Sequence, residues 1–249
     1  MERKNSRWFK YSGKGSPQGG LQLFCFPHAG GSARLYKDWA QIAEPEINVF
    51  PIQLPMRENR YSEKLPDRIE AVVDEFLQEN QELFQENYAV FGHSLGAIFA
   101  LELVYALQQR KARPCTCLFV SGTSYPKDKK VTAPFDEEEI REKLYLLGDA
   151  DRELYSSELF MQYYLPVISK DLSLFSNYEW KYGEEKLKCP LYLFGAKQDD
   201  SISIGKMRTW ENSSSDYLGE TFFDGGHFYL TDHQQEMLQI IKTVCRGCK

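Results

Sequence analysis

The sequence lacks long hydrophobic runs: no stretch approaches the roughly 18 apolar residues that a membrane-spanning helix needs. It also lacks the apolar core of a secretory signal peptide, because residues 1–20 are basic and contain Gly, Ser and Pro. An excess of positive charge is missing too, since the 249 residues carry a formal net charge of −6. These absences argue against a membrane protein and a nucleic-acid partner. We expect a cytoplasmic protein in which residues 1–20 form a flexible tail.

Cysteine patterns typical of metal or redox sites are also scarce. Only Cys245 and Cys248 form a C-x-x-C motif, and no second Cys or His pair completes a zinc site. The remaining cysteines lie in apolar, strand-like runs, where buried thiols are common: they are Cys25, Cys115, Cys117 and Cys189. We therefore expect reduced, structural cysteines, no metal and no cofactor.

Short apolar segments alternate with helix-like segments along most of the chain. Strands are expected at 21–26, 47–52, 88–91, 115–120, 191–194 and 221–223. The intervening helices are expected at 36–42, 66–84, 95–109 and 234–244. Such alternation predicts an α/β fold, with a mainly parallel sheet covered by helices on both faces. Residues 21–249 are expected to form this single domain.

The alternation stops between residues 131 and 188. Helix-like segments at 136–147, 151–164 and 169–180 follow one another there without a strand. This insertion predicts a helical lid over the carboxyl end of the sheet. It is rich in aromatic side chains that could line a covered apolar groove: Tyr145, Tyr155, Phe160, Tyr163, Tyr164, Phe175 and Tyr178.

The strongest local signal is Gly92-His93-Ser94-Leu95-Gly96, between a predicted strand and a predicted helix. A serine on such a sharp turn is strained and exposed at the sheet edge, where it serves as a nucleophile. The two glycines allow close approach of neighbouring backbone. Ser94 is therefore the candidate nucleophile. The backbone N–H of Leu95, at the helix N-terminus, is a candidate oxyanion donor.

A nucleophilic serine needs a base, and the chain offers only four histidines. His93 adjoins the nucleophile and should point into packing, whereas His233 is expected to open the last helix. His28 lies in an early loop. His227 follows the last predicted strand, which agrees with the chain order Ser, acid, His of α/β-hydrolases. His227 is the candidate base.

The acid should follow a strand between the serine and the base. Asp199 and Asp200 both lie in the loop after the predicted strand 191–194. The position of Ile202, which can anchor the following helix, favours Asp199, and Asp200 remains the alternative. A second oxyanion N–H is expected from Ala29, in the loop after the first strand.

Several motifs together resemble the type II thioesterases. They are Phe26-Pro27-His28-Ala29-Gly30-Gly31, the Ser94 motif and Asp224-Gly225-Gly226-His227-Phe228. Leu54-Pro55-Met56-Arg57-Glu58 resembles a further segment of the family, with Met56 in place of Gly. The segment 165–171 resembles its lid motif, in which a basic residue precedes Asp171. The loop from Gly195 to Asp199 is slightly longer than in the family pattern.

The resemblance implies an α/β-hydrolase that hydrolyses acyl or aminoacyl thioesters on the phosphopantetheine arm of a carrier protein. Such enzymes edit misloaded carriers or release products in nonribosomal peptide, polyketide and fatty acid synthesis. Carrier proteins in such systems are generally acidic, and this chain is acidic too. Docking would therefore need apolar contacts or a local basic spot, for which Lys127, Lys129 and Lys130 are candidates. A monomer is expected.

Other functions fit parts of the same pattern. A carboxylesterase acting on small free esters would have the same nucleophile and triad. A malonyl-type acyltransferase usually has Glu after the last glycine of the serine motif, whereas Ala97 stands here. A binding protein that retains only the fold is disfavoured by the intact Ser94, His227 and acid.

Overall fold

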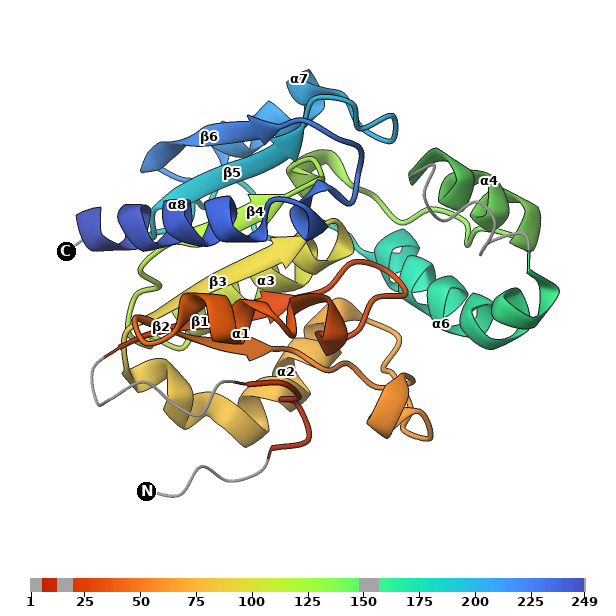
Figure 1. Ribbon diagram of the computed structural model, residues 1–249, viewed down its shortest axis with the longest axis horizontal. Helices are drawn as coiled ribbons and strands as arrows, with labels where there is room; N and C mark the ends of the chain where they lie inside the picture. The colour runs from red at the N-terminus through yellow and green to blue at the C-terminus, as the bar shows by residue number, and fades with distance from the viewer. Residues whose placement is uncertain (1–5, 13–19, 148–156, 249) are drawn as a thin grey trace.

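A computed structural model describes residues 6–12, 20–147 and 157–248. Its centre is a six-stranded sheet with the order β2-β1-β3-β4-β5-β6. Every neighbouring pair of strands in this sheet is parallel. The strands are β1 Leu21–Phe26, β2 Ile47–Pro51, β3 Tyr88–His93, β4 Leu118–Ser121, β5 Leu191–Ala196 and β6 Tyr217–Phe223. Their carboxyl ends all point toward the same edge of the molecule (Figure 1).

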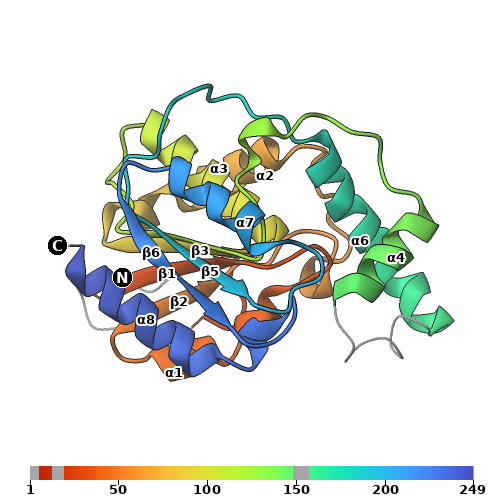
Figure 2. The same cartoon turned by 90° about the horizontal axis from the view of Figure 1, so that it is seen from above.

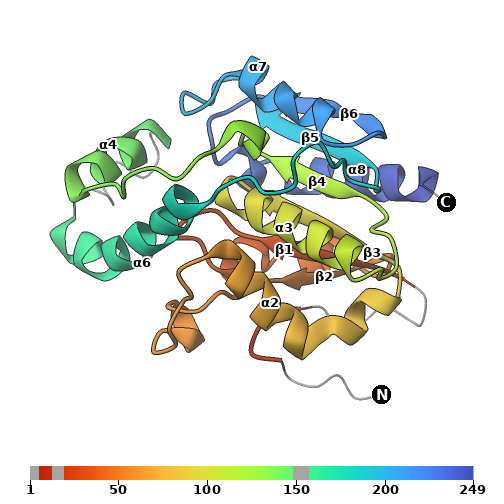
Figure 3. The same cartoon turned by 180° about the vertical axis from the view of Figure 1, so that it is seen from behind.

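Helices cover both faces of the sheet (Figure 2). One face carries α1 Trp39–Ala43 and α8 Gln234–Gly247, and the other carries α2 Ile69–Asn80, α3 Leu95–Gln109 and the short α7 Ile204–Met207. Alternation along β3 divides the core accordingly. Val90 joins the cluster under α2 and α3, whereas Ala89 and Phe91 join the cluster under α1 and α8. The predicted doubly covered parallel sheet is confirmed (Figures 2 and 3).

Short 3₁₀ helices occupy several of the connections. They are η1 Ala33–Tyr36, η2 Glu58–Arg60, η3 Gln81–Gln85, η4 Pro126–Asp128, η6 Arg208–Asn212 and η7 Tyr229–Thr231. The last strand, β6, begins at Tyr217, earlier than the predicted 221. Its first residues include Gly219 at φ 136°, beside a register shift against β5, so the apolar alternation that marks a strand is weak there.

The N-terminal segment differs from its prediction. Trp8 is fully buried, and its ring packs edge-on against Phe76 of α2 with 5.4 Å between centroids. Phe9 forms an isolated antiparallel bridge with Ile52. The prediction of a flexible tail is therefore wrong for residues 6–12. Two adjacent aromatic side chains bury enough apolar surface to hold this segment on the sheet, although its other residues are polar.

The predicted lid is helical and lies beyond the carboxyl ends of the strands (Figure 1). It consists of α4 Glu137–Leu147 and α6 Glu158–Asn177. The predicted break between 164 and 169 is wrong, because α6 continues through Pro166. A proline removes one helical hydrogen bond, but packing on both sides of it outweighs that local cost. The predicted helical residues 151–156 lie outside the described residues.

Within the described part of the chain, no helix combines the length and apolarity needed to cross a membrane.

Candidate active site

Ser94 lies between β3 and α3, at the turn that the sequence pattern predicts. Its backbone has φ 55° and ψ −122°, a conformation that non-glycine residues rarely adopt. The turn is held by a hydrogen bond of 2.7 Å from the Ser94 N–H to the carbonyl oxygen of Ser121, at the end of β4. The side chain is partly exposed, unlike its buried neighbours. The fold therefore presents this hydroxyl at the carboxyl edge of the sheet.

The glycines beside Ser94 are required by close backbone approach. A Cβ on Gly92 would lie 2.1 Å from the carbonyl oxygen of Gly96. A Cβ on Gly96 would lie 2.3 Å from the carbonyl oxygen of Phe26, at the end of β1. Because these neighbours are backbone atoms, a side chain could be accommodated only by shifting the turn. The first turn of α3 is thereby pressed against the chain that enters the loop after β1.

His227 and Asp199 form a buried hydrogen-bonded pair. The Nδ1 atom of His227 lies 2.7 Å from Oδ2 of Asp199, and their side chains are 3% and 0% exposed. An ionised carboxylate can only accept, so Nδ1 carries the proton and Nε2 of the neutral ring keeps its lone pair. Asp200 is exposed on the same loop. Of the two predicted acids, the structure brings Asp199 to His227.

Ser201 supports this pair, although nothing in the sequence pattern singled it out. Its hydroxyl donates to Oδ1 of Asp199 at 2.5 Å, and its backbone N–H donates to the same atom at 2.9 Å. Burial raises the pKa of Asp199. The hydrogen bonds and charge of His227, together with those from Ser201, outweigh burial and leave this pKa below its ordinary value. The carboxylate is therefore ionised at neutral pH.

The His227 ring lies close to the Ser94 turn. A Cβ on Gly122, the residue after Ser121, would lie 3.3 Å from Cε1 of His227. The rings of His93 and His227 are 4.8 Å apart. Among the described residues no hydrogen bond joins the Ser94 hydroxyl to His227. In hydrolases without substrate such contacts are often long, and they tighten on binding.

His93 is structural, as predicted. It is fully buried, and its Nδ1 lies 2.8 Å from the hydroxyl of Ser121. That hydroxyl lies 2.6 Å from the hydroxyl of Tyr229, in the segment after His227. Burial lowers the pKa of His93 well below its ordinary value, which keeps the ring neutral. The sequence contained no signal for Ser121 or Tyr229, because their pairing depends on two distant segments meeting beside β4.

The predicted oxyanion residues lie at adjoining backbone segments. Leu95 is the first residue of α3, so its N–H has no partner within the helix. Ala29 lies in the loop after β1, whose end contacts the first turn of α3 through Gly96. In the described residues, neither the Ala29 N–H nor the Leu95 N–H donates to a protein acceptor. An N–H group without a protein acceptor is what an oxyanion donor requires.

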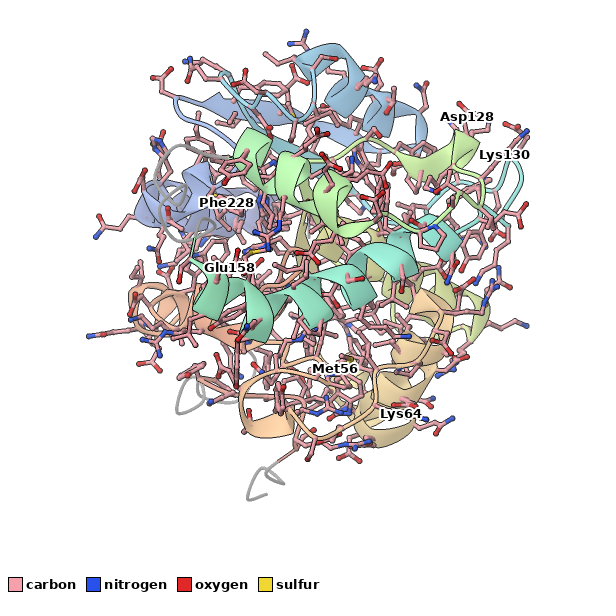
Figure 4. The ribbon with its side chains drawn as sticks, turned by 90° about the vertical axis from the view of Figure 1, so that its right-hand side faces the viewer. Met56, Lys64, Asp128, Lys130, Glu158 and Phe228 are labelled. Carbon is pink, nitrogen blue, oxygen red and sulfur yellow. The ribbon has the colours of Figure 1, made fainter. Side chains whose placement is uncertain are left out.

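The His28 ring lies in the same loop. It packs against Phe228 with 4.9 Å between centroids, and its Nδ1 lies 2.8 Å from the carbonyl oxygen of Ala29. Burial lowers the pKa of His28 to about 4, so the ring is neutral near pH 7. Phe228 is labelled in Figure 4, in which α4 and α6 lie in front of the sheet.

Met56 occupies a position that favours glycine. Its φ is 67°, in the left-handed region. The resembling family segment has Gly here, and the structure shows why.

The described residues contain no cluster of three or more His, Cys, Asp or Glu that could hold a metal ion.

The parallel sheet, the strained serine turn and the His–Asp pair together define an α/β-hydrolase. The chain belongs to the thioesterase family, since the family's "Thioesterase domain" matches residues 21–245. The predicted resemblance to type II thioesterases is confirmed, and with it the predicted class of enzyme.

Individual relatives agree with this assignment. The chain is 31% identical over 225 residues to the gramicidin S biosynthesis protein GrsT of Aneurinibacillus migulanus, covering 89% of this chain and 87% of that protein. It is 29% identical over 226 residues to the thioesterase PikA5 of Streptomyces venezuelae, covering 89% and 80%. The type II thioesterase BorB from the borrelidin biosynthetic cluster has a similar structure, with a TM-score of 0.85 and 28% identity over 98% of this chain and 100% of that one.

Proposed function

We propose that this thioesterase uses Ser94, His227 and Asp199 as a catalytic triad to hydrolyse acyl or aminoacyl thioesters carried on the phosphopantetheine arm of carrier proteins. The observation that carries the triad is the buried 2.7 Å pair of His227 and Asp199 beside the strained Ser94 turn. Such a pair presents Nε2 of the imidazole as a base and stabilises the imidazolium that forms.

The reaction follows from this arrangement. The Ser94 hydroxyl attacks the thioester carbonyl while Nε2 of His227 takes its proton, and Asp199 stabilises the charged ring. The Leu95 and Ala29 N–H groups bind the oxyanion, each contributing about 3 kcal/mol of transition-state stabilisation. The thiol of the arm leaves with the proton from His227. A water molecule activated by His227 then hydrolyses the acyl ester of Ser94.

The biosynthetic relatives support the substrate class. GrsT is named as a gramicidin S biosynthesis protein and PikA5 as a thioesterase. BorB is named as a type II thioesterase from the borrelidin biosynthetic cluster. In such systems the acyl groups to be removed are carrier-bound.

The lid has exposed aromatic rings suited to an apolar partner or acyl chain. Tyr163 is 52% exposed and stacks on Tyr61 with 5.4 Å between centroids. The removal of misloaded groups or the release of product is the proposed role.

The predicted basic docking spot is weak. Lys127 already pairs with Glu184 at 2.7 Å. The Lys129 ammonium group bonds the carbonyl oxygens of Lys130 and Ser176 and lies over the ring of Phe175. Figure 4 places Asp128 and Lys130 beyond the carboxyl end of α6, at the opposite end of this helix from Glu158. We therefore expect apolar contacts to contribute more than charge to carrier docking.

A reducing compartment such as the cytoplasm fits the cysteines. All six are free thiols, and Cys25, Cys115 and Cys117 are buried in apolar surroundings. We expect the protein to act as a monomer, which analytical ultracentrifugation would test.

The proposed function is tested by hydrolysis of acyl groups from loaded carrier proteins, with a p-nitrophenyl ester and an acyl-CoA as comparison substrates. We expect fast release from the carrier and weak activity on the free ester. Ser94→Ala should lower kcat by about 10⁶-fold, as in other serine hydrolases. Strong ester turnover without preference for the carrier would instead favour the carboxylesterase. Full carrier hydrolysis by Ser94→Ala would end the proposal.

A further inference from the structure

A buried ion pair connects helix α6 of the lid to the turn after β2. Arg57 and Asp171 are 5% and 0% exposed, so both charges are removed from water. Their contact is bidentate: Nη2 of Arg57 donates to Oδ1 of Asp171 at 2.7 Å, and Nη1 donates to Oδ2 at 2.8 Å. The two residues are 114 positions apart in sequence. The mechanism proposed above uses neither of them.

Both members of the pair also bond the backbone of the loop after β1. Oδ2 of Asp171 accepts from the Gly30 N–H at 2.7 Å. Nη1 of Arg57 donates to the carbonyl oxygen of Gly31 at 2.8 Å. The Gly30 nitrogen belongs to the peptide that follows Ala29. Fixing this peptide plane therefore restricts the backbone of Ala29, the predicted oxyanion donor.

Helix α6 contacts the same loop directly. A Cβ on Gly30, which has φ 76°, would lie only 2.6 Å from Cγ1 of Ile168. Ile168 lies three positions before Asp171 and thus on the same side of the helix. The loop is held in place by an apolar contact from Ile168 and a polar one from Asp171.

The guanidinium group of Arg57 is itself fixed by the turn that carries it. Its Nε donates to the carbonyl oxygen of Pro55 at 3.0 Å. Nε2 of Gln53 donates to the carbonyl oxygen of Arg57 at 3.1 Å, and Oε1 of Gln53 accepts from the Ala33 N–H at 3.0 Å. In Figure 4, Met56, the residue before Arg57, lies below α6. The guanidinium group that donates to Asp171 and to Gly31 is therefore itself held in place.

We infer that Arg57 and Asp171 are positioning residues that hold the Ala29 N–H in place to bind the oxyanion and thereby couple the oxyanion site to the lid. The inference rests on the proposed function, in which Ala29 is an oxyanion donor. Removing Asp171 leaves the buried Arg57 charge without its partner and takes the acceptor from the Gly30 N–H, whereas removing Arg57 takes the donor from the Gly31 carbonyl oxygen. Loss of the pair should therefore weaken stabilisation of the transition state and leave substrate binding unchanged.

The first test compares Asp171→Leu, which removes the acceptor of the Gly30 N–H, with wild type on the N-acetylcysteamine thioester of a short acyl group, which mimics the end of the arm without carrier docking. Loss of one oxyanion donor costs about 10²–10³-fold in kcat, and we expect a loss of at least about tenfold here, with KM little changed. The inhibition constant of a trifluoromethyl ketone, which forms an oxyanion on Ser94, should rise by the same factor as kcat falls. Unchanged kcat and inhibition constant would overturn the inference.

A matched control distinguishes positioning from stability. Glu102 is also a buried carboxylate, 2% exposed, with hydrogen bonds from the hydroxyls of Tyr178 and Tyr182 at 2.7 Å and an ion pair with Lys181 at 3.0 Å. Among the described residues, none of these contacts reaches the loop after β1. Glu102→Gln should lower thermal stability while leaving kcat and the inhibition constant unchanged. Equal loss of kcat in both variants would show a merely structural effect and overturn the inference.

The double variant Arg57→Met/Asp171→Leu provides a second control, because replacing a buried ion pair by apolar residues is often neutral for stability. We expect its melting temperature to return toward wild type while kcat stays low. Recovery of kcat together with stability would contradict the positioning role. If the wild-type protein itself shows no Ser94-dependent thioester hydrolysis, the proposed function fails instead, which is a distinct outcome.

Discussion

The inner and outer halves of helix α6 are held by different parts of the protein. The inner half, after Pro166, places Asp171 on the loop after β1 and buries Leu174 completely in the core under α2 and α3. The outer half, before Pro166, contacts α4 through a small cluster around Met161, which Ile168 of the inner half also joins. Its Leu159 is 80% exposed. Figure 1 shows α4 and this outer half farthest from the sheet.

This difference separates precision from adaptability. The inner half and the sheet edge hold groups that must keep their geometry through the reaction. The outer half has few buried contacts, which is typical of segments that open at low free energy. We propose that a lid built this way admits acyl groups of different shape without disturbing the loop after β1.

The largest effect should come from the sheet edge. Asp199→Asn removes the charge that orients and stabilises the His227 ring, and such a change costs about 10⁴-fold in turnover. Asp200→Asn, the neighbouring exposed carboxylate, should stay within about twofold of wild type. Steady-state hydrolysis of a small thioester measures both. Equal losses, or a larger loss at Asp200, would contradict the pairing in the structure.

Gly96→Ala tests how tightly the first turn of α3 packs against the chain that enters the loop after β1. The added Cβ would meet the carbonyl oxygens of Phe26 and Pro27 at 2.3 and 2.6 Å, both backbone atoms. We expect a loss of about 3 kcal/mol in the free energy of unfolding in urea. Gly205→Ala in α7 is the matched control. Nothing lies within 4 Å of its Cβ position, so it should be neutral or gain up to about 1 kcal/mol. Similar values for the two variants would contradict the close approach.

Truncations in the two halves of α6 test their separation directly. Leu174→Ala should lower the global free energy of unfolding by about 2–5 kcal/mol, because its cavity lies in the main core. Met161 is equally buried, at 1% exposed. Met161→Ala should mainly increase limited proteolysis near residues 158–165 and change the global value less. Equal global losses would show that the outer half unfolds together with the core.

The smallest effect concerns pH and the loop after β1. The folded pKa of His28 is about 4, below the value of about 6.5 in an unfolded chain. The unfolded state therefore binds the proton first on acidification. The contribution of neutral His28 is complete above about pH 6.5 and is lost as pH falls toward 4.

Urea unfolding of wild type and His28→Gln at several pH values between 7 and 4 measures this effect. As pH falls, the free energy of unfolding should decrease more steeply for wild type than for His28→Gln, by up to about 1.4 kcal/mol per pH unit. Parallel pH profiles would show that His28 does not titrate differently in the folded protein.

Much of the fold follows from local sequence patterns. The alternating short strands and the amphipathic α2 were predicted within a few residues, because period and chain punctuation depend only on neighbouring residues. The N-terminal segment was missed, since the burial of Trp8 depends on Phe76 of a later helix. The continuity of α6 through Pro166 was missed because packing overrode the local signal of a proline.

By itself, the sequence determined the type of sheet and the Ser94 turn, and it singled out His227 among the histidines as the base that we propose. These depend on glycine spacing and on the order of segments along the chain. Only the tertiary structure decided that Asp199, and not Asp200, meets His227, and that Arg57 and Asp171 hold the loop of Ala29. The physical reason is the same for both. A carboxylate acquires its partner only when distant segments are brought together and water is excluded around it, and no local pattern encodes that exclusion.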